Sequence, residues 1–119
     1  MALKHIRLAL ARTPDLPEGS IHCGYEMNLP LDGAGKIDPS GWKAHRKNCT
    51  VRRFWKGEDD ETGQIVKVGR GWALSYDPDT EADDEPMFRL EQHRFQPGDY
   101  LSITEHDGAQ RTFKVVFVR

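Results

Sequence analysis

The chain has 119 residues, of which 37% are hydrophobic and 30% charged, and its 17 basic and 19 acidic residues nearly balance. This length suffices for one hydrophobic core, and we expect a single β-rich domain over residues 1–119. The formal net charge of -2 excludes a global electrostatic attraction to nucleic acid or membranes. With two cysteines and no long apolar run, the sequence predicts a cytoplasmic protein with reduced thiols and no membrane association. The sequence does not determine the oligomeric state, and we favour a monomer.

Alternating apolar and polar residues predict short strands along most of the chain. In chain order, we expect strands near residues 5–10, 21–29, 51–56, 66–68, 72–76, 88–90, 101–105 and 111–118. Acidic or glycine-rich connections at 58–63, 69–71 and 77–85 separate several of them and suit antiparallel neighbours. The fold class is therefore mainly β. The expected architecture is a small antiparallel meander barrel of about eight short strands, with a two-sheet β-sandwich as the alternative.

One segment has a helical pattern. Asp38 fits the N-cap position and Pro39 the first helical position, so we expect a helix that runs to about Asn48. A single short helix in a meander barrel would plug one end of the barrel or lie across the sheet.

The last quarter of the chain predicts a closing hairpin. Gly108 follows Asp107 at a tip that favours a left-handed residue, and the resulting register puts Leu101 opposite Phe113. In this register the end near Glu105 is solvated. Residues 115–118 are all apolar, which predicts that this strand is covered on both faces.

Basic residues and aromatic rings lie close together between residues 36 and 56. The candidate binding residues are Lys43, Arg46 and Lys47 in the helix and Arg52, Arg53, Phe54 and Lys56 in the strand. Nucleic acid requires cations for its phosphates and flat rings for unstacked bases, and alternation places Arg52, Phe54 and Lys56 on one face. The first hypothesis is therefore a binding module for a protein or for single-stranded nucleic acid. The alternative assigns Trp55 to the core and pairs the arginines with acidic loops.

Two further functions remain open. The second hypothesis is a small ligand-binding or enzymatic barrel, with a pocket at the barrel mouth lined by Tyr25, Trp72 and Tyr76. The chain contains none of the common enzyme signatures, such as Gly-x-Ser-x-Gly or a phosphate-binding glycine loop. We therefore predict no catalytic residue and no cofactor.

The third hypothesis is a zinc-stabilised interaction domain. Its ligands would be His22, Cys23, His45 and Cys49, which are the residue types that bind zinc. Because His22 and Cys23 are adjacent in a predicted strand, their side chains should point to opposite faces. We therefore expect no metal site.

Two resemblances concern the end of the chain. Phe95-x-Pro97-Gly98-Asp99, with the strand and hairpin that follow, resembles the final strands of PUA-like small barrels, some of which bind RNA or modified bases. The lysine–glutamate motif of the related ASCH domains has no match here. Together with Arg52-Arg53-Phe54-Trp55, the segment His93-x-Phe95-x-Pro97-Gly98-Asp99-Tyr100 also resembles an uncharacterised group of small bacterial proteins. That second resemblance implies a bacterial, intracellular, single-domain protein and carries over no activity or cofactor.

Overall fold

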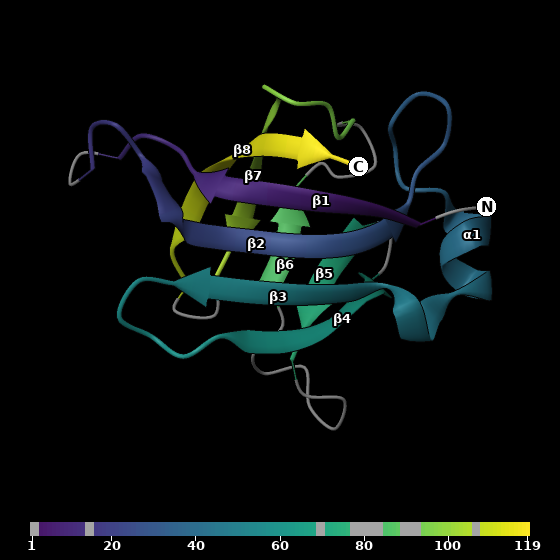
Figure 1. Ribbon diagram of the computed structural model, residues 1–119. Helices are drawn as coiled ribbons and strands as arrows, with labels where there is room; N and C mark the ends of the chain where they lie inside the picture. Colours follow the sequence, from purple (N-terminus) through teal and green to yellow (C-terminus); the bar gives the residue numbers. More distant parts are fainter. Residues whose placement is uncertain (1–2, 14–15, 69–70, 77–84, 89–93, 106–107) are drawn as a thin grey trace.

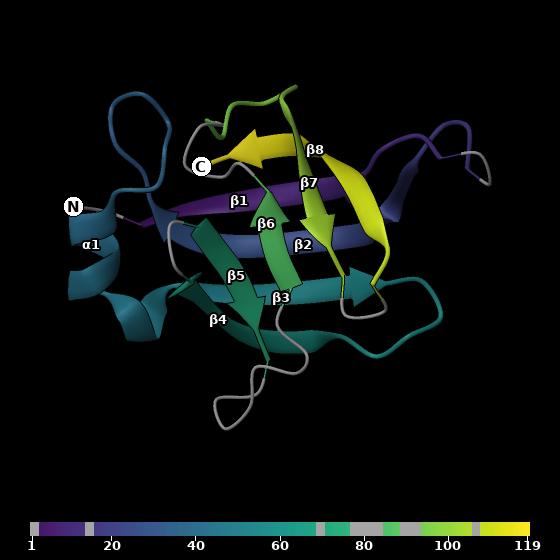
Figure 2. The ribbon, with the colours of Figure 1, turned by 180° about the vertical axis from the view of Figure 1, so that it is seen from behind.

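The strands of the protein close into a barrel in simple chain order (Figures 1 and 2). The computed structural model describes residues 3–13, 16–68, 71–76, 85–88, 94–105 and 108–119. Its strands are β1 (Leu3–Leu10), β2 (Ser20–Pro30), β3 (Thr50–Trp55), β4 (Glu61–Val68), β5 (Gly71–Ser75), β6 (Glu85–Phe88), β7 (Tyr100–Thr104) and β8 (Gln110–Val118). A helix, α1 (Pro39–Ala44), and a 3-10 turn, η1 (Arg46–Asn48), connect β2 to β3. The predicted antiparallel meander barrel with one short helix is confirmed.

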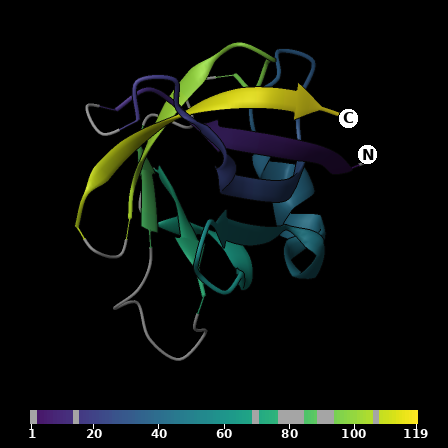
Figure 3. The ribbon, with the colours of Figure 1, turned by 60° about the vertical axis from the view of Figure 1, so that its left-hand side comes forward.

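Strand β8 closes the barrel because it pairs with two neighbours. Its first half pairs with β7 and places Leu101 opposite Phe113, as the hairpin pattern predicted. Its second half pairs with β1 and places Ile6 opposite Val118. Figure 3 shows β8 as a long curved strand that reaches from β7 across to β1.

The interior of the barrel is one hydrophobic core. Its largest fully buried side chains are those of Tyr25, Phe113, Ile6, Leu8, Met27, Leu29, Ile65, Leu74, Ile103 and Val51. Strands β1, β2, β5, β7 and β8 contribute alternate residues to this core, because successive side chains of a strand point to opposite faces. The remaining residues of β1, β2 and β3 form an outer wall that no helix covers in either view (Figures 1 and 2).

Helix α1 lies at one end of the barrel, beside the start of β3 (Figure 1). Asp38 caps it as predicted, since its carboxylate accepts a hydrogen bond from the amide of Ser40 at 3.0 Å. The α-helix ends at Ala44 rather than near residue 48, because His45 leaves the helical conformation with φ -125° and a 3-10 turn follows. The indole nitrogen of Trp42 donates to the carbonyl of Ile65 at 2.8 Å and so attaches the helix to β4.

One predicted connection, the acidic turn at 58–63, differs from the structure in its bounds. Strand β4 begins at Glu61, so Gly63 belongs to a strand rather than to the acidic turn. A side chain at this position would be excluded, because a Cβ atom on Gly63 would lie 2.2 Å from the carbonyl oxygen of Ser75. The expected hairpin between β4 and β5 is confirmed by the pairing of Val68 with Gly71, and the expected partner of β5 is indeed β6. Residues 69–70, 77–84 and 89–93 lie outside the described part.

Two predictions about the last strand pair are wrong. Residues 115–118 are not covered on both faces: Val115 is buried, but Val116 is 44% exposed, because it shares the outer face of the strand with the exposed Lys114. The end of the hairpin near Glu105 is not solvated either. Glu105 is only 2% exposed, and its carboxylate is surrounded by hydrogen-bond donors that come from other strands.

Candidate functional site

Strand β3 presents its charged residues to two different environments. The β2–β3 register pairs Arg52 with Glu26 on the outer wall and Arg53 with Tyr25 on the inner face. Phe54 lies on the same outer wall as Arg52, opposite Gly24, whereas Trp55 packs against the core. The alternation predicted from the sequence is therefore confirmed, and the arginines of the strand belong to two separate clusters.

The outer cluster is centred on the carboxylate of Glu26. Arg7 and Arg52 both form ion pairs with it, and the ring of His5 is hydrogen-bonded to it at 2.8 Å. Partial burial raises the pKa of this carboxyl, but the His5 hydrogen bond and the two arginine charges outweigh burial and bring the pKa below its ordinary value. Arg52 also pairs with Asp60 at 2.7 Å. Its guanidinium is therefore held between two carboxylates.

The ring of Phe54 lies beneath this cluster. The guanidinium of Arg7 is centred 4.4 Å from the ring and that of Arg52 5.4 Å from it, and Phe54 is only 8% exposed. Cation–π contacts of this kind hold flexible arginine side chains over the ring. Most of the Phe54 ring is thus covered by protein, which leaves a small part of it to meet a ligand.

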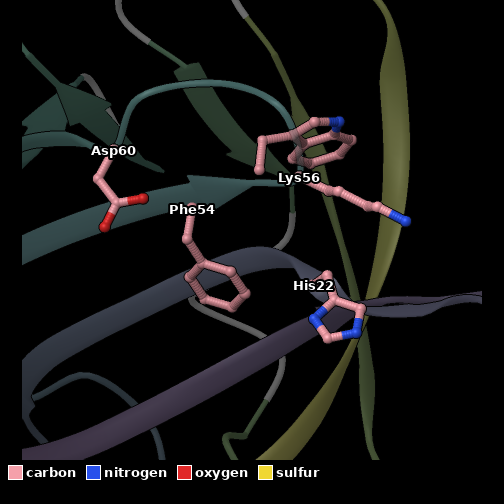
Figure 4. Close-up of a pocket in the computed structure, with 5 residues that line it drawn as sticks. His22, Phe54, Lys56 and Asp60 are labelled. Carbon is pink, nitrogen blue, oxygen red and sulfur yellow. The ribbon is translucent and has the colours of Figure 1, made fainter.

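The uncovered part of Phe54 lines a small open hollow of about 310 Å³. The lining residues are His22, Phe54, Trp55, Lys56 and Asp60. Figure 4 shows the Phe54 ring between Asp60 on the left and His22 on the right, with the Lys56 side chain extending to the right above His22. The hollow combines three flat rings, one cation and one carboxylate, which suits a small planar polar group.

A second hollow of about 490 Å³ lies toward the start of the same strand, β3. Thr50 and Arg52 of β3 line it, together with polar residues of β1, β2 and β4 such as Asn28 and Gln64. Asn28 is fixed by its hydrogen bond to the Thr50 hydroxyl at 3.0 Å. The two hollows therefore follow each other along the outer wall, and the Arg52–Asp60 ion pair lies where they meet.

The inner cluster is centred on Glu105. Its side chain is 1% exposed and accepts hydrogen bonds from the Tyr25 hydroxyl at 2.6 Å, from Arg53 at 2.9 Å and from Arg111 at 2.7 Å. Burial lowers the pKa of Arg53, but the hydrogen bond and charge of Glu105 outweigh burial and raise it. Arg53 also reaches the exposed Glu58 at 3.3 Å, so its charge is balanced. This cluster is buried, which suits a structural role rather than contact with a partner.

The basic residues predicted on the helix lie far from the first hollow. Lys43 is in α1, and Arg46 and Lys47 are in η1, at the end of the barrel where β3 begins (Figure 1). Lys56 follows the other end of β3, which as a six-residue strand spans roughly 20 Å. The structure thus separates the helical cations from the cation beside the first hollow.

The residues of the other two hypotheses lie in different parts of the barrel. Tyr25 and Trp72 are 0% and 2% exposed and pack within the core, and Tyr76 is partly buried against that core. Of the four possible zinc ligands, Cys23 and Cys49 are buried and His22 is exposed, so the predicted divergence of His22 and Cys23 is confirmed.

Burial raises the pKa of the Cys49 thiol, which makes it a poor nucleophile at neutral pH. Within the described ranges, no group of three His, Cys, Asp or Glu residues could hold a metal ion.

Several residues of the outer cluster escaped the sequence analysis. His5, Arg7 and Glu26 are polar residues in alternating strands, and such residues normally face solvent singly. The one local indication of this cluster was Glu26, a charged residue in the middle of β2. Its role becomes clear only once the register places Arg7 of β1 and Arg52 of β3 beside it.

The helices in the described part of the chain are all too short or too polar to cross a membrane. No family model matches the chain, and neither does any curated protein or solved structure.

Proposed function

We propose that this protein is a small binding module that holds single-stranded nucleic acid along the outer wall of β3. The observation that carries the proposal is the succession of two hollows along this strand, one at Phe54 and Lys56 and the next at Thr50 and Arg52. Outward-facing residues of a strand recur about every 7 Å, a spacing similar to that of nucleotides in an extended single strand. An extended chain can therefore contact both hollows with neighbouring units.

Each hollow suits a different part of a nucleotide. The first has a volume near the lower limit of small-molecule sites, and a base can pack there against His22 and Phe54. Lys56 is exposed and forms no ion pair within the described part of the chain, so its ammonium group can meet a phosphate. The hydroxyl and amide groups of the second hollow, from Thr50 and Gln64, suit hydrogen bonds to sugar and phosphate oxygens.

Arg52 acts on this site mainly through Asp60. Glu26 and Asp60 largely balance the charge of Arg52 through two ion pairs. The pair with Asp60 also fixes the Asp60 carboxylate at the edge of the first hollow. Few cations therefore remain for phosphates, and we expect a shallow salt dependence, about -0.7 in log–log slope for each phosphate contact. A role in RNA binding would also agree with the resemblance of the last quarter to PUA-like barrels.

The proposal is tested by titrating a labelled single-stranded oligonucleotide of mixed sequence, with fluorescence anisotropy at low salt. Wild type should bind with a Kd below about 100 μM, the weak limit of non-specific binding. Lys56→Glu should weaken binding about tenfold, because it reverses the charge beside the first hollow. His22→Ala should weaken it at least about fivefold, because it removes an exposed stacking ring.

The matched control is Lys36→Glu, which makes the same charge reversal at an exposed position that lines neither hollow. It should leave the affinity within about twofold of wild type, since exposed charges away from the site are screened. Equal losses for Lys56→Glu and Lys36→Glu would show that general attraction, rather than the wall of β3, holds the strand. No binding by wild type at about 100 μM would refute the proposal.

A further inference from the structure

A larger groove lies on a different part of the outer wall, where the end of β1 and the start of β2 meet β7 and β8. Its volume is about 950 Å³, and its described lining shares no residue with the two hollows along β3. The function proposed above makes no use of this groove.

The groove gathers most of the exposed apolar side chains of the protein. The large hydrophobic residues with high exposure in the described structure are Leu16, Ile21, Tyr100 and Val116, and the last three of these line this groove. Ile21 is 69% exposed and Tyr100 53% exposed. Single exposed apolar residues are ordinary, but a contiguous apolar patch with a polar rim is typical of an interaction surface.

The exposure of Val116 follows from its place in β8. Phe113 and Val115 point into the core, so Lys114 and Val116 point to the outer wall, where both line the groove. Pairing between β1 and β8 passes from Arg7 opposite Phe117 to Leu8 opposite Val115, so Val116 is also the extra residue of a β-bulge. The groove thus has an apolar side chain on the solvent-facing side of the strand.

The charged residues around the groove indicate the sign of the charge that its occupant carries. Arg12 and Lys114 line it, and neither has an ion-pair partner within the described residues, whereas Glu18 is the one described acid in the lining. By contrast, Arg7, Arg52 and Arg53 are all paired with carboxylates. Unpaired cations beside an exposed apolar floor favour an occupant that is both apolar and acidic.

We propose that this groove is a docking site for an extended segment of a partner protein in which apolar and acidic side chains alternate. The apolar side chains pack against Ile21, Tyr100 and Val116. The carboxylates lie toward Arg12 and Lys114. A volume near the upper limit of small-molecule sites suits several side chains of a peptide better than one compact ligand. The module would then join a nucleic acid on one part of its wall to a protein on another.

The test uses three labelled synthetic peptides and fluorescence anisotropy. In the first, leucine alternates with glutamate; in the second, lysine replaces every glutamate; in the third, serine replaces every leucine. The first should bind wild type with a Kd below about 100 μM, and the other two at least about tenfold more weakly. Backbone amide shifts in the NMR spectrum should change near Val116 and Tyr100 and not near Phe54.

Two groove variants and one matched control sharpen the result. Val116→Asp and Lys114→Glu should each weaken binding of the leucine–glutamate peptide by about tenfold. Both positions are exposed on the outer wall, so neither change disturbs the core. Lys36→Glu makes the same charge reversal at an exposed position outside the groove lining and should stay within about twofold of wild type.

Three results would overturn the proposal. Wild type fails to bind the leucine–glutamate peptide at about 1 mM, the weakest affinity that a specific contact would have. The lysine peptide binds as tightly as the glutamate peptide. Alternatively, wild type self-associates in sedimentation experiments and Val116→Asp abolishes the association, in which case a second copy of the chain occupies the groove. The peptide and the oligonucleotide are tested with different variants. A negative result with the peptide therefore does not affect the nucleic-acid proposal, which the oligonucleotide titration tests.

Discussion

Two carboxylates of this barrel, Glu26 and Glu105, each hold a pair of arginines, one cluster outside the wall and the other inside it. Glu26 pairs with Arg7 and Arg52 with its side chain 15% exposed, whereas Glu105 pairs with Arg53 and Arg111 at 1% exposure. The donors are alike in kind, but water and salt reach the first carboxylate and hardly reach the second. Burial therefore decides whether the same ion pairs stabilise the fold strongly or mainly orient side chains at the surface.

The largest expected effect follows from breaking the inner cluster. Glu105→Gln keeps the size of the side chain but leaves Arg53 without its buried counter-charge, which should destabilise the fold by about 3–5 kcal/mol. The free energy of unfolding in urea measures this change.

The matched control is Glu58→Gln, because Glu58 contacts the same Arg53 at 3.3 Å but is 56% exposed. It should cost less than about 0.5 kcal/mol, as exposed ion pairs generally do. Similar losses for Glu58→Gln and Glu105→Gln would mean that burial does not separate the two environments.

The outer cluster should give a smaller loss. Glu26→Gln removes the shared partner of Arg7 and Arg52, and we expect a destabilisation of about 1–2 kcal/mol. Urea unfolding under the same conditions provides the comparison. A loss as large as that of Glu105→Gln would show that the outer cluster behaves as a buried one.

Glu26 should contribute to the loss of stability of the fold at acid pH. Its pKa in the folded state lies below the ordinary value of 4.5, so its contribution is present at neutral pH and is lost as the pH falls through the folded-state pKa. The difference in unfolding free energy between wild type and Glu26→Gln should therefore shrink below about pH 4. Unfolding curves from neutral to acid pH measure it, and a difference that stays constant to about pH 3 would contradict the assignment.

The smallest effect concerns salt. Raising the ionic strength to about 1 M shortens the screening length to about 3 Å, so the cost of Glu26→Gln should fall by a few tenths of a kcal/mol. The cost of Glu105→Gln should not change, because salt does not reach a side chain that is 1% exposed. Equal salt dependence in the two variants would contradict the distinction between the clusters.

Local pattern alone determined most of the architecture. Alternation located the strands, and Asp38 with Pro39 located the start of the helix. Turn chemistry predicted that Gly108 would have positive φ, observed at 85°, and it predicted the register between Leu101 and Phe113. These features depend on residues that are close in sequence, so the strand period and the turn type are sufficient to predict them.

The clusters and the groove depended on the tertiary structure. Tyr25 and Glu105 are 80 residues apart, and Arg53 and Glu105 are 52 apart, so only closure of the barrel brings their charges and hydrogen-bonding groups together. Val116 illustrates the same limit within one strand. Its apolar neighbours predicted burial on both faces, but only one face of β8 meets the core, and Val116 lies on the other face and is 44% exposed. Whether that outer face is covered depends on the elements that pack there, which the pattern of one strand does not contain.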